Sequence, residues 1–171
     1  PEILNTVSLV LFAGSCLAIA IFGLKVQHRP RVAELAFLIV ASFLLFNKVW
    51  SPQYSLWLVP LAVLALPRWR LLFPWMLVDA LVWPILMWHM MGTDNMGIPS
   101  GVLDLVLITR DGFIVAMVVL VIRQMMGRTP DPVLDAHAGK DPLAGVFGDT
   151  DTFTLAARRP AERRQALKEE K

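Results

Sequence analysis

Apolar residues fall into long blocks along this chain, without the strict alternation that marks a half-buried strand. A helix needs roughly 20 consecutive apolar residues to cross the hydrocarbon core of a bilayer. The blocks cover residues 3–24, 32–50, 52–67, 71–91 and about 105–123. The pattern therefore predicts an all-α fold, a polytopic transmembrane helix bundle of about five spans within residues 1–126.

Two of these spans are irregular. The third holds about 16 residues, or roughly 24 Å of helix, which is short for a 30 Å core, and Pro60 predicts a kink in it. The fifth can begin at Val102 or at Asp111. The first choice buries Arg110 and Asp111 in the span, whereas the second gives a short helix preceded by an interfacial or re-entrant segment over residues 102–109.

Residues 127–171 have a different composition. The segment 128–132 breaks the last span with two prolines, residues 139–154 are rich in Gly, Asp and Thr, and residues 158–171 are mostly charged. Because few apolar residues are available there to form a core, we expect a mostly disordered tail.

Composition narrows the classes of function. The chain is 56% hydrophobic and 18% charged, and its formal charge of +2 is too small to indicate binding to nucleic acid. Its three histidines are scattered and its single cysteine, Cys16, lies in an apolar block, so we expect no metal site, no internal disulfide and no cofactor. The chain begins at Pro1 without the features of a signal peptide, and we expect it to be the C-terminal part of a longer protein.

Positive charge marks one side of the predicted bundle. The positive-inside rule places that side, and with it the C-terminus, in the cytoplasm of a multi-pass plasma-membrane protein. The other side then holds residues 47–54, His89 and the loop 92–101. The residues that define the basic side are Lys25, Arg29, Arg31, Arg68, Arg70, Arg123 and Arg128.

A polar island, residues 47–57, interrupts the apolar blocks. Ser51 suits a helix cap and Pro52 the first helical position, so a helix starting here presents free N–H groups and the positive end of its dipole beside Lys48. Such an arrangement can bind a phosphate. An ordinary hairpin, anchored at the interface by its lysine and aromatic residues, explains the same pattern. The candidate phosphate ligands are Asn47, Lys48, Ser51, Gln53 and Tyr54.

Four further polar residues lie in the apolar blocks. We expect Asp79 to face the bundle interior in a structural pairing, with a helix missing from this chain as one conceivable partner. His89 and Arg110 are accessory site candidates, although an interfacial role explains each of them. Arg110 and Asp111 are adjacent, so on one helix they should point about 100° apart rather than at each other.

The segment 46–61, FNKVWSPQYSLWLVPL, resembles the C-terminal part of an actinobacterial integral membrane glycosyltransferase of family 87. This family includes mannosyltransferases that use polyprenyl-phosphate-mannose. The segments 67–70, 110–111 and 131–132 are similar to that group as well. The likeness covers roughly residues 1–132 and is most specific over 46–61.

The resemblance implies a C-type fold that moves a hexose, such as mannose, from a polyprenyl-phosphate donor to an extracytoplasmic lipid or glycan acceptor. Membrane lipids, this donor and this acceptor are then the partners. The catalytic base of the family is an acidic residue in the first extracytoplasmic loop, and no residue here corresponds to it. We therefore assign no catalytic residue to this chain, and we expect the isolated chain to be inactive.

Two other classes of function fit the same spans. A transporter or lipid flippase predicts transport without any glycosidic product, and it commonly shows internal repeats. A non-catalytic membrane scaffold predicts that function depends on the tail and not on the polar island.

Overall fold

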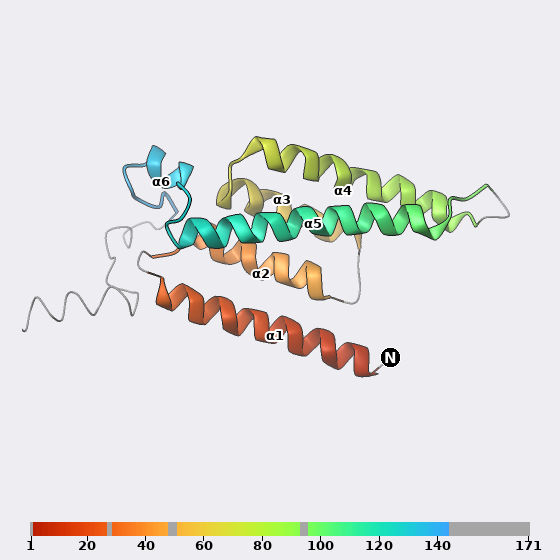
Figure 1. Ribbon diagram of the computed structural model, residues 1–171, viewed down its shortest axis with the longest axis horizontal. Coiled ribbons are helices and arrows are strands. Elements are labelled where there is room, and N and C mark those ends of the chain that lie inside the picture. Colours follow the sequence, from red (N-terminus) through yellow and green to blue (C-terminus); the bar gives the residue numbers. More distant parts are fainter. Residues whose placement is uncertain (1, 27–28, 48–50, 93–95, 144–171) are drawn as a thin grey trace, which may run out of the picture.

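The chain forms a bundle of helices in a computed structural model that describes residues 2–26, 29–47, 51–92 and 96–143 (Figure 1). Within these ranges there are six helices and no strand, so the predicted all-α class is confirmed. The helices are α1 (Glu2–Lys25), α2 (Val32–Phe46), α3 (Pro52–Ala65), α4 (Trp69–Met90), α5 (Ser100–Met125) and α6 (Pro132–Ala136).

Three of the helices, α1, α4 and α5, are long and apolar enough to cross a membrane, which indicates a multi-pass membrane protein. Helices α2 and α3 are apolar but have only 15 and 14 residues. At 1.5 Å per residue they reach about 22 Å and 21 Å, less than a 30 Å hydrocarbon core. Of the five predicted spans, three thus have the length of a full crossing.

Consecutive helices run in opposite directions. Figure 1 shows that the paired helices α4 and α5 reach well beyond the ends of α2 and α3. We call the end of the bundle that holds Lys25, Arg31 and Arg68 the basic end, and the opposite end, where α4 turns into α5, the hairpin end. The short helix α6 lies at the basic end.

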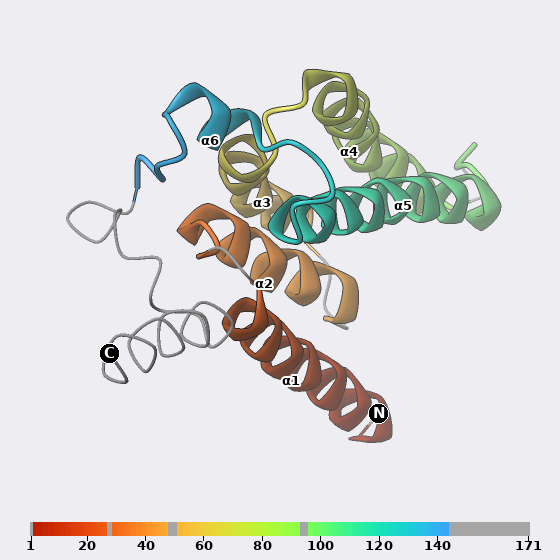
Figure 2. The ribbon, with the colours of Figure 1, turned by 60° about the vertical axis from the view of Figure 1, so that its left-hand side comes forward.

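The core forms where α2, α3, α4 and α5 meet. Phe37, Leu58, Trp75 and Met117 are fully buried there, together with small residues such as Ala62. Small side chains at helix crossings let backbones approach closely, which is how membrane helices gain packing energy. Helix α1 contributes no buried residue and packs against α2 at the margin of the bundle (Figure 2).

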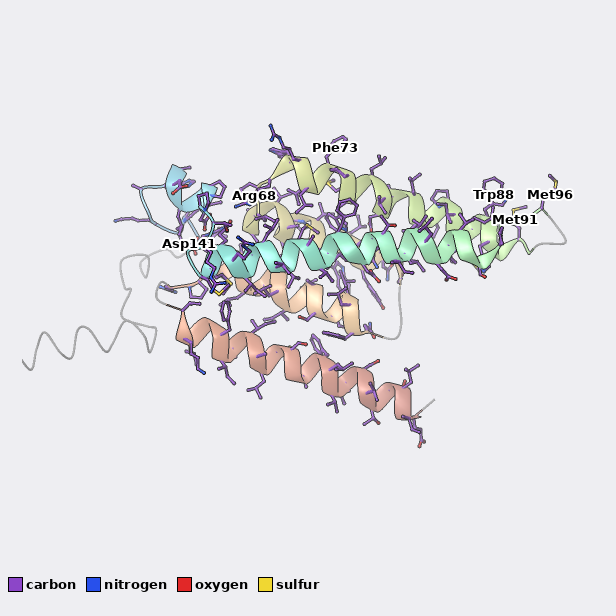
Figure 3. The ribbon with its side chains drawn as sticks, in the orientation of Figure 1. Arg68, Phe73, Trp88, Met91, Met96 and Asp141 are labelled. Carbon is purple, nitrogen blue, oxygen red and sulfur yellow. The ribbon has the colours of Figure 1, made fainter. Side chains whose placement is uncertain are left out.

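Large side chains on the outside of the bundle face away from it. Figure 3 shows Phe73 pointing outward from α4, and its side chain is 70% exposed. Trp88, Met91 and Met96 gather at the turn of the hairpin end and are also exposed. An apolar exterior of this kind matches a lipid environment, because lipid tails solvate such residues where water would not.

The structure corrects the start of the fifth span. Helix α5 is continuous from Ser100, so the interpretation of residues 102–109 as a separate re-entrant segment is wrong. Pro99 occupies the N-cap position with an extended backbone, and no proline follows it within the helix. The alternative that started the span near Val102 and enclosed Arg110 is the one that the structure supports.

The polar island and the tail also differ from their predictions. Helix α2 ends at Phe46 because Asn47 is already extended, whereas the predicted span continued to residue 50. Helix α3 continues through Pro60. The first part of the predicted tail is folded against the bundle, with α6 at residues 132–136, while residues 144–171 lie outside the described part.

Candidate functional site

A buried polar network joins three helices toward the hairpin end. Arg110 of α5 donates through Nε to Oδ1 of Asp79 on α4 at 2.9 Å, and through Nη2 to Oγ of Ser55 on α3 at 3.0 Å. Ser55 in turn donates to the same Asp79 oxygen at 2.7 Å. Arg110 is 1% exposed, so the network lies inside the bundle. We call these residues, together with Asp111, the Arg110 network.

Asp111 extends this network toward the outside. Its carboxylate accepts a hydrogen bond from Arg110 Nη1 at 2.9 Å, although the two residues are adjacent on α5. The prediction that the two side chains point apart is therefore wrong, because the long guanidinium can turn back to its neighbour. The side chain of Asp111 is 45% exposed, against 18% for Asp79. The network holds one positive and two negative charges, and this net negative charge disfavours the binding of an anion.

The predicted pairing of Asp79 inside the bundle is confirmed, and its partners are Ser55 and Arg110. From the sequence, the partner of Asp79 could also have been on a helix missing from this chain. In the structure its two partners, Ser55 and Arg110, lie on α3 and α5 of this chain. Intramembrane acids are expensive unless they are paired, which explains why Ser55 and Arg110 converge on one oxygen. Ser55 was not among the predicted site residues, since an isolated serine in an apolar span carries no signal of its own.

The polar island is only partly described, and Lys48 lies outside the described residues. Ser51 occupies the N-cap position of α3, but its side chain makes no capping hydrogen bond. The N–H of Tyr54, predicted to be free, donates to the carbonyl of Ser51 at 3.0 Å. Gln53 is exposed and Asn47 is half-buried at the end of α2. The island thus has an exposed polar side chain, but fewer free N–H groups than expected.

An aromatic cluster packs beside the start of α3. The rings of Tyr54 and Trp57 lie 4.9 Å apart, and Phe43 of α2 contacts both, at 5.8 Å and 6.4 Å between ring centroids. Phe12 of α1 contacts Phe43 edge to face at 5.8 Å. These contacts hold the polar island against α1 and α2, and they explain why Tyr54 is half-buried.

The length of the helices sets the depth of the polar island. Counted from the basic end, α3 reaches about 21 Å and α5 about 39 Å at 1.5 Å per residue. The start of α3 therefore lies well below the tip of the α4–α5 hairpin (Figure 1). Ser55 is one helical turn from Ser51, so the Arg110 network anchors the polar island from inside. The two polar features that the sequence singled out separately thus lie close together.

His89 lies away from this site. Its Nδ1 is 2.9 Å from the carbonyl oxygen of Ile98, across the turn between α4 and α5. The neighbouring Trp88 donates to the carbonyl of Met96 at 2.8 Å. Both contacts close the hairpin, so the geometry gives His89 a structural task at this turn.

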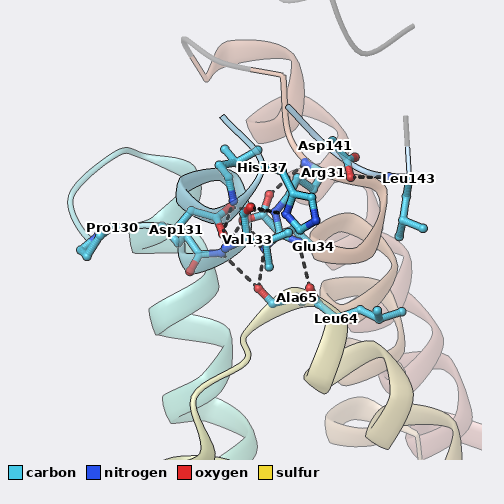
Figure 4. Close-up of polar contacts among 12 residues, drawn as sticks. Arg31, Glu34, Leu64, Ala65, Pro130, Asp131, Val133, His137, Asp141 and Leu143 are labelled. Atoms are coloured by element: carbon cyan, nitrogen blue, oxygen red, sulfur yellow. Dashed lines mark hydrogen bonds and ion pairs between the residues drawn. The ribbon is translucent and has the colours of Figure 1, made fainter. Parts of the chain in front are cut away.

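A second buried network, which the sequence did not reveal, lies at the basic end (Figure 4). Arg31 is 2% exposed and its guanidinium bonds Asp131 at 2.7 Å and 3.2 Å. It also donates to the carbonyls of Leu64 and Ala65 at the end of α3, at 2.8 Å and 2.7 Å. This Arg31 network ties the chain after α5 to the start of α2 and the end of α3.

Glu34 and Gln124 complete the Arg31 network. Glu34 accepts from the backbone N–H of Arg31 and from the side-chain amide of Gln124, both at 2.9 Å. The same amide reaches the carbonyl of Ala65 at 3.1 Å. A glutamate in the first turn that bonds back to the N-cap amide is a recognisable local pattern. The contact between Arg31 and Asp131 spans a hundred residues, and no local pattern predicts it.

The described residues include no group of three or more His, Cys, Asp or Glu side chains that could hold a metal ion. Their polar chemistry is therefore that of hydrogen bonding and charge pairing in two buried networks, one of which supports the polar island. No protein-family model, no curated protein and no solved structure matches this chain.

Proposed function

We propose that this chain is part of an integral membrane glycosyltransferase that moves a hexose from a polyprenyl-phosphate donor to an extracytoplasmic acceptor. The proposal rests on one observation, which is that the polar island and the Arg110 network lie at the same level of the bundle. The polar island begins α3, and the Arg110 network fixes the first turn of that same helix through Ser55. A buried charge costs several kcal/mol in a membrane. Because the charged Arg110 network positions the start of the short helix α3, we infer that a binding site lies there.

The donor in this proposal approaches from the lipid. A polyprenyl phosphate keeps its chain in the bilayer and its phosphate near the surface. Helices α2 and α3 are too short to reach the level that α4 and α5 reach, so a phosphate bound at the start of α3 would lie below that level. Lys48 supplies a positive charge, and Gln53 and Tyr54 supply hydrogen bonds to oxygen atoms. The resemblance of residues 46–61 to family 87 supports the same reading.

A transporter is the second candidate, and Asp111 is the observation that favours it. Paired charges within membrane spans commonly mark ion pathways. Asp111 is half-exposed and bonded to the buried Arg110, so it can connect the interior of the bundle to its outside. In this second function the Arg110 network changes its pairing during transport, whereas in the first it remains a fixed support.

The test uses the whole protein that contains this chain, reconstituted in liposomes with radiolabelled polyprenyl-phosphate-mannose. Lys48→Ala should lower mannose transfer at least tenfold without changing expression or thermal stability. Lys140→Ala, beyond α6 at the basic end, is the matched control and should retain transfer. Normal turnover by Lys48→Ala would remove the phosphate role. Vectorial movement of a substrate without any glycosidic product would favour the transporter.

A further inference from the structure

A hollow lies at the basic end, between the last turn of α1 and the turn that follows α5. It has a volume of about 490 Å³, and its wall includes Phe22 and Lys25 of α1 and Met126, Gly127 and Arg128 beyond α5. Helices α1 and α5 are both long enough to cross a membrane, and both end here. The hollow therefore lies where two spans leave the hydrocarbon core.

The backbone turn after α5 fixes Arg128 at the edge of the hollow. Gly127 has a φ of +68°, a left-handed conformation that glycine adopts without strain. Its N–H donates to the carbonyl of Gln124, and the N–H of Arg128 donates to the carbonyl of Arg123, both at 2.9 Å. This pair of bonds is the Schellman arrangement that ends many helices. Arg128 therefore extends from a defined backbone position beside the last turn of α5.

The charged side chains that line the hollow are both cationic. Lys25 and Arg128 are exposed, and neither side chain forms a hydrogen bond or an ion pair within the described part of the chain. No carboxylate among the described residues lines the hollow. Glu34 and Asp131 line a neighbouring cavity instead, where both contact Arg31. The two cations of the hollow thus lack a counter-charge in its wall.

The helix ends weaken this positive charge without cancelling it. The C-terminus of a helix carries about half a negative elementary charge, and both α1 and α5 end at the hollow. Two full positive charges against about one negative charge leave about one net positive charge. The hollow therefore favours a ligand with a single negative charge.

The position and the apolar part of the wall indicate where this anion comes from. Basic residues at the ends of spans lie at the level of the lipid headgroups, and basic pockets between membrane helices bind anionic headgroups. Phe22, Val26 and Met126 line the hollow beside the two cations. A free phosphate would use the cations alone, whereas a lipid also has methylene groups that contact these apolar side chains.

We propose that this hollow binds one anionic phospholipid, whose phosphate lies between Lys25 and Arg128. The first methylene groups of its chains lie against Phe22 and Met126. The guanidinium of Arg128 can hold two phosphate oxygens, and Lys25 adds a point charge. Phosphatidylcholine has the same phosphate, but the two cations repel its trimethylammonium group. The site is independent of the proposed transferase function and lies at the opposite end of the bundle from the polar island.

The test measures the lipid that the full chain retains in native mass spectrometry, with phosphatidylglycerol and phosphatidylcholine of identical acyl chains. Phosphatidylglycerol should bind about tenfold more tightly, the effect of one charge-assisted hydrogen bond. An excess of inorganic phosphate should not displace it, because inorganic phosphate lacks the apolar contacts. Equal retention of the two lipids would overturn the proposal, and displacement by inorganic phosphate would overturn the assignment to a lipid.

Charge-removing variants locate the site. Lys25→Gln and Arg128→Gln should each weaken phosphatidylglycerol about fivefold and leave phosphatidylcholine unchanged, and the double variant should lose the preference. Arg123→Gln is the matched control, because Arg123 is an exposed arginine in the last turn of α5 that does not line the hollow. It should bind as the unaltered chain does. A loss in Arg123→Gln as large as that in Arg128→Gln would indicate general attraction to a basic surface and contradict the site.

Discussion

At the scale of single residues, two arginines organise the interior of the bundle. Arg31 and Arg110 are nearly inaccessible to solvent, and each contacts groups on several different segments. Arginine suits this task because its planar guanidinium presents five donors in fixed directions and stays charged. Each arginine also costs desolvation energy, so its carboxylate partners determine whether the arrangement is stable.

The first prediction separates the two carboxylates of the Arg110 network. Asp79→Ala removes the acceptor of both Arg110 and Ser55 and leaves the buried Arg110 with Asp111, a half-exposed carboxylate, as its remaining partner in this network, which should cost about 3–5 kcal/mol of unfolding free energy. Asp111→Ala removes a half-exposed partner and should cost less than about 1 kcal/mol. Thermal unfolding in detergent, monitored by intrinsic tryptophan fluorescence, measures both. Asp79→Asn, which keeps an oxygen acceptor, should fall between them.

An equal loss in the two alanine variants would contradict this assignment. It would mean that Arg110 depends on both carboxylates alike, and that the difference in their exposure has no energetic consequence.

At the scale of elements, the short helix α6 is more than the start of a tail. Asp131 caps it by accepting from the N–H groups of Val133 and Leu134, and the same carboxylate pairs with Arg31. Arg68 donates to the carbonyl of Pro130 at 3.1 Å and adds a contact to the turn after α3. Asp131 therefore connects the bundle, through Arg31, to the short helix that follows it.

The second prediction tests this role by truncation. A chain ending after residue 143 keeps every contact described here, whereas a chain ending after residue 127 loses Asp131, the carboxylate to which the Arg31 guanidinium is hydrogen-bonded, and keeps as its carboxylate contact the longer one of 3.8 Å with Glu34. The shorter chain should unfold at a clearly lower temperature than the longer one in the same detergent. Asp131→Asn in the untruncated chain is the matched variant, and it should reproduce part of the loss. Coinciding transitions of the two truncated chains would show that α6 does not stabilise the bundle.

At the scale of the whole molecule, unequal helix lengths give the bundle two different ends. The basic end brings several helix ends together, and the hairpin end consists of α4 and α5 alone (Figure 1). The start of α3 is recessed between these levels. From this asymmetry we predict that Ser51 and Met96 lie on one side of the membrane and Arg70 on the other.

The third prediction is a labelling pattern. In a Cys16→Ser background, a membrane-impermeant maleimide should modify Met96→Cys and Ser51→Cys from the same side of sealed vesicles. Ser51→Cys should react more slowly because α3 begins below the level of the hairpin. Arg70→Cys should react only from the opposite side. Modification of Ser51→Cys from the Arg70 side, or at the rate of Met96→Cys, would contradict the recessed arrangement.

The sequence by itself determined the helices. Their apolar composition and their breaks at proline and polar residues are local properties, so four of the five predicted spans begin within about three residues of the observed helices. The fifth was uncertain because Arg110 and Asp111 look like a boundary when only their neighbours in sequence are considered. A charged pair inside a helix is stable only if other helices supply partners, and sequence spacing does not show them.

The tertiary structure alone decided the pairings. Asp79 meets Arg110 across 31 residues, and Arg31 meets Asp131 across a hundred. Such contacts depend on which faces of the helices meet, and the hydrophobic blocks here are apolar on all sides and therefore do not specify those faces. Local composition was thus sufficient to predict the helices. The pairing of the buried charged residues depends on how distant segments pack, and only the tertiary structure shows it.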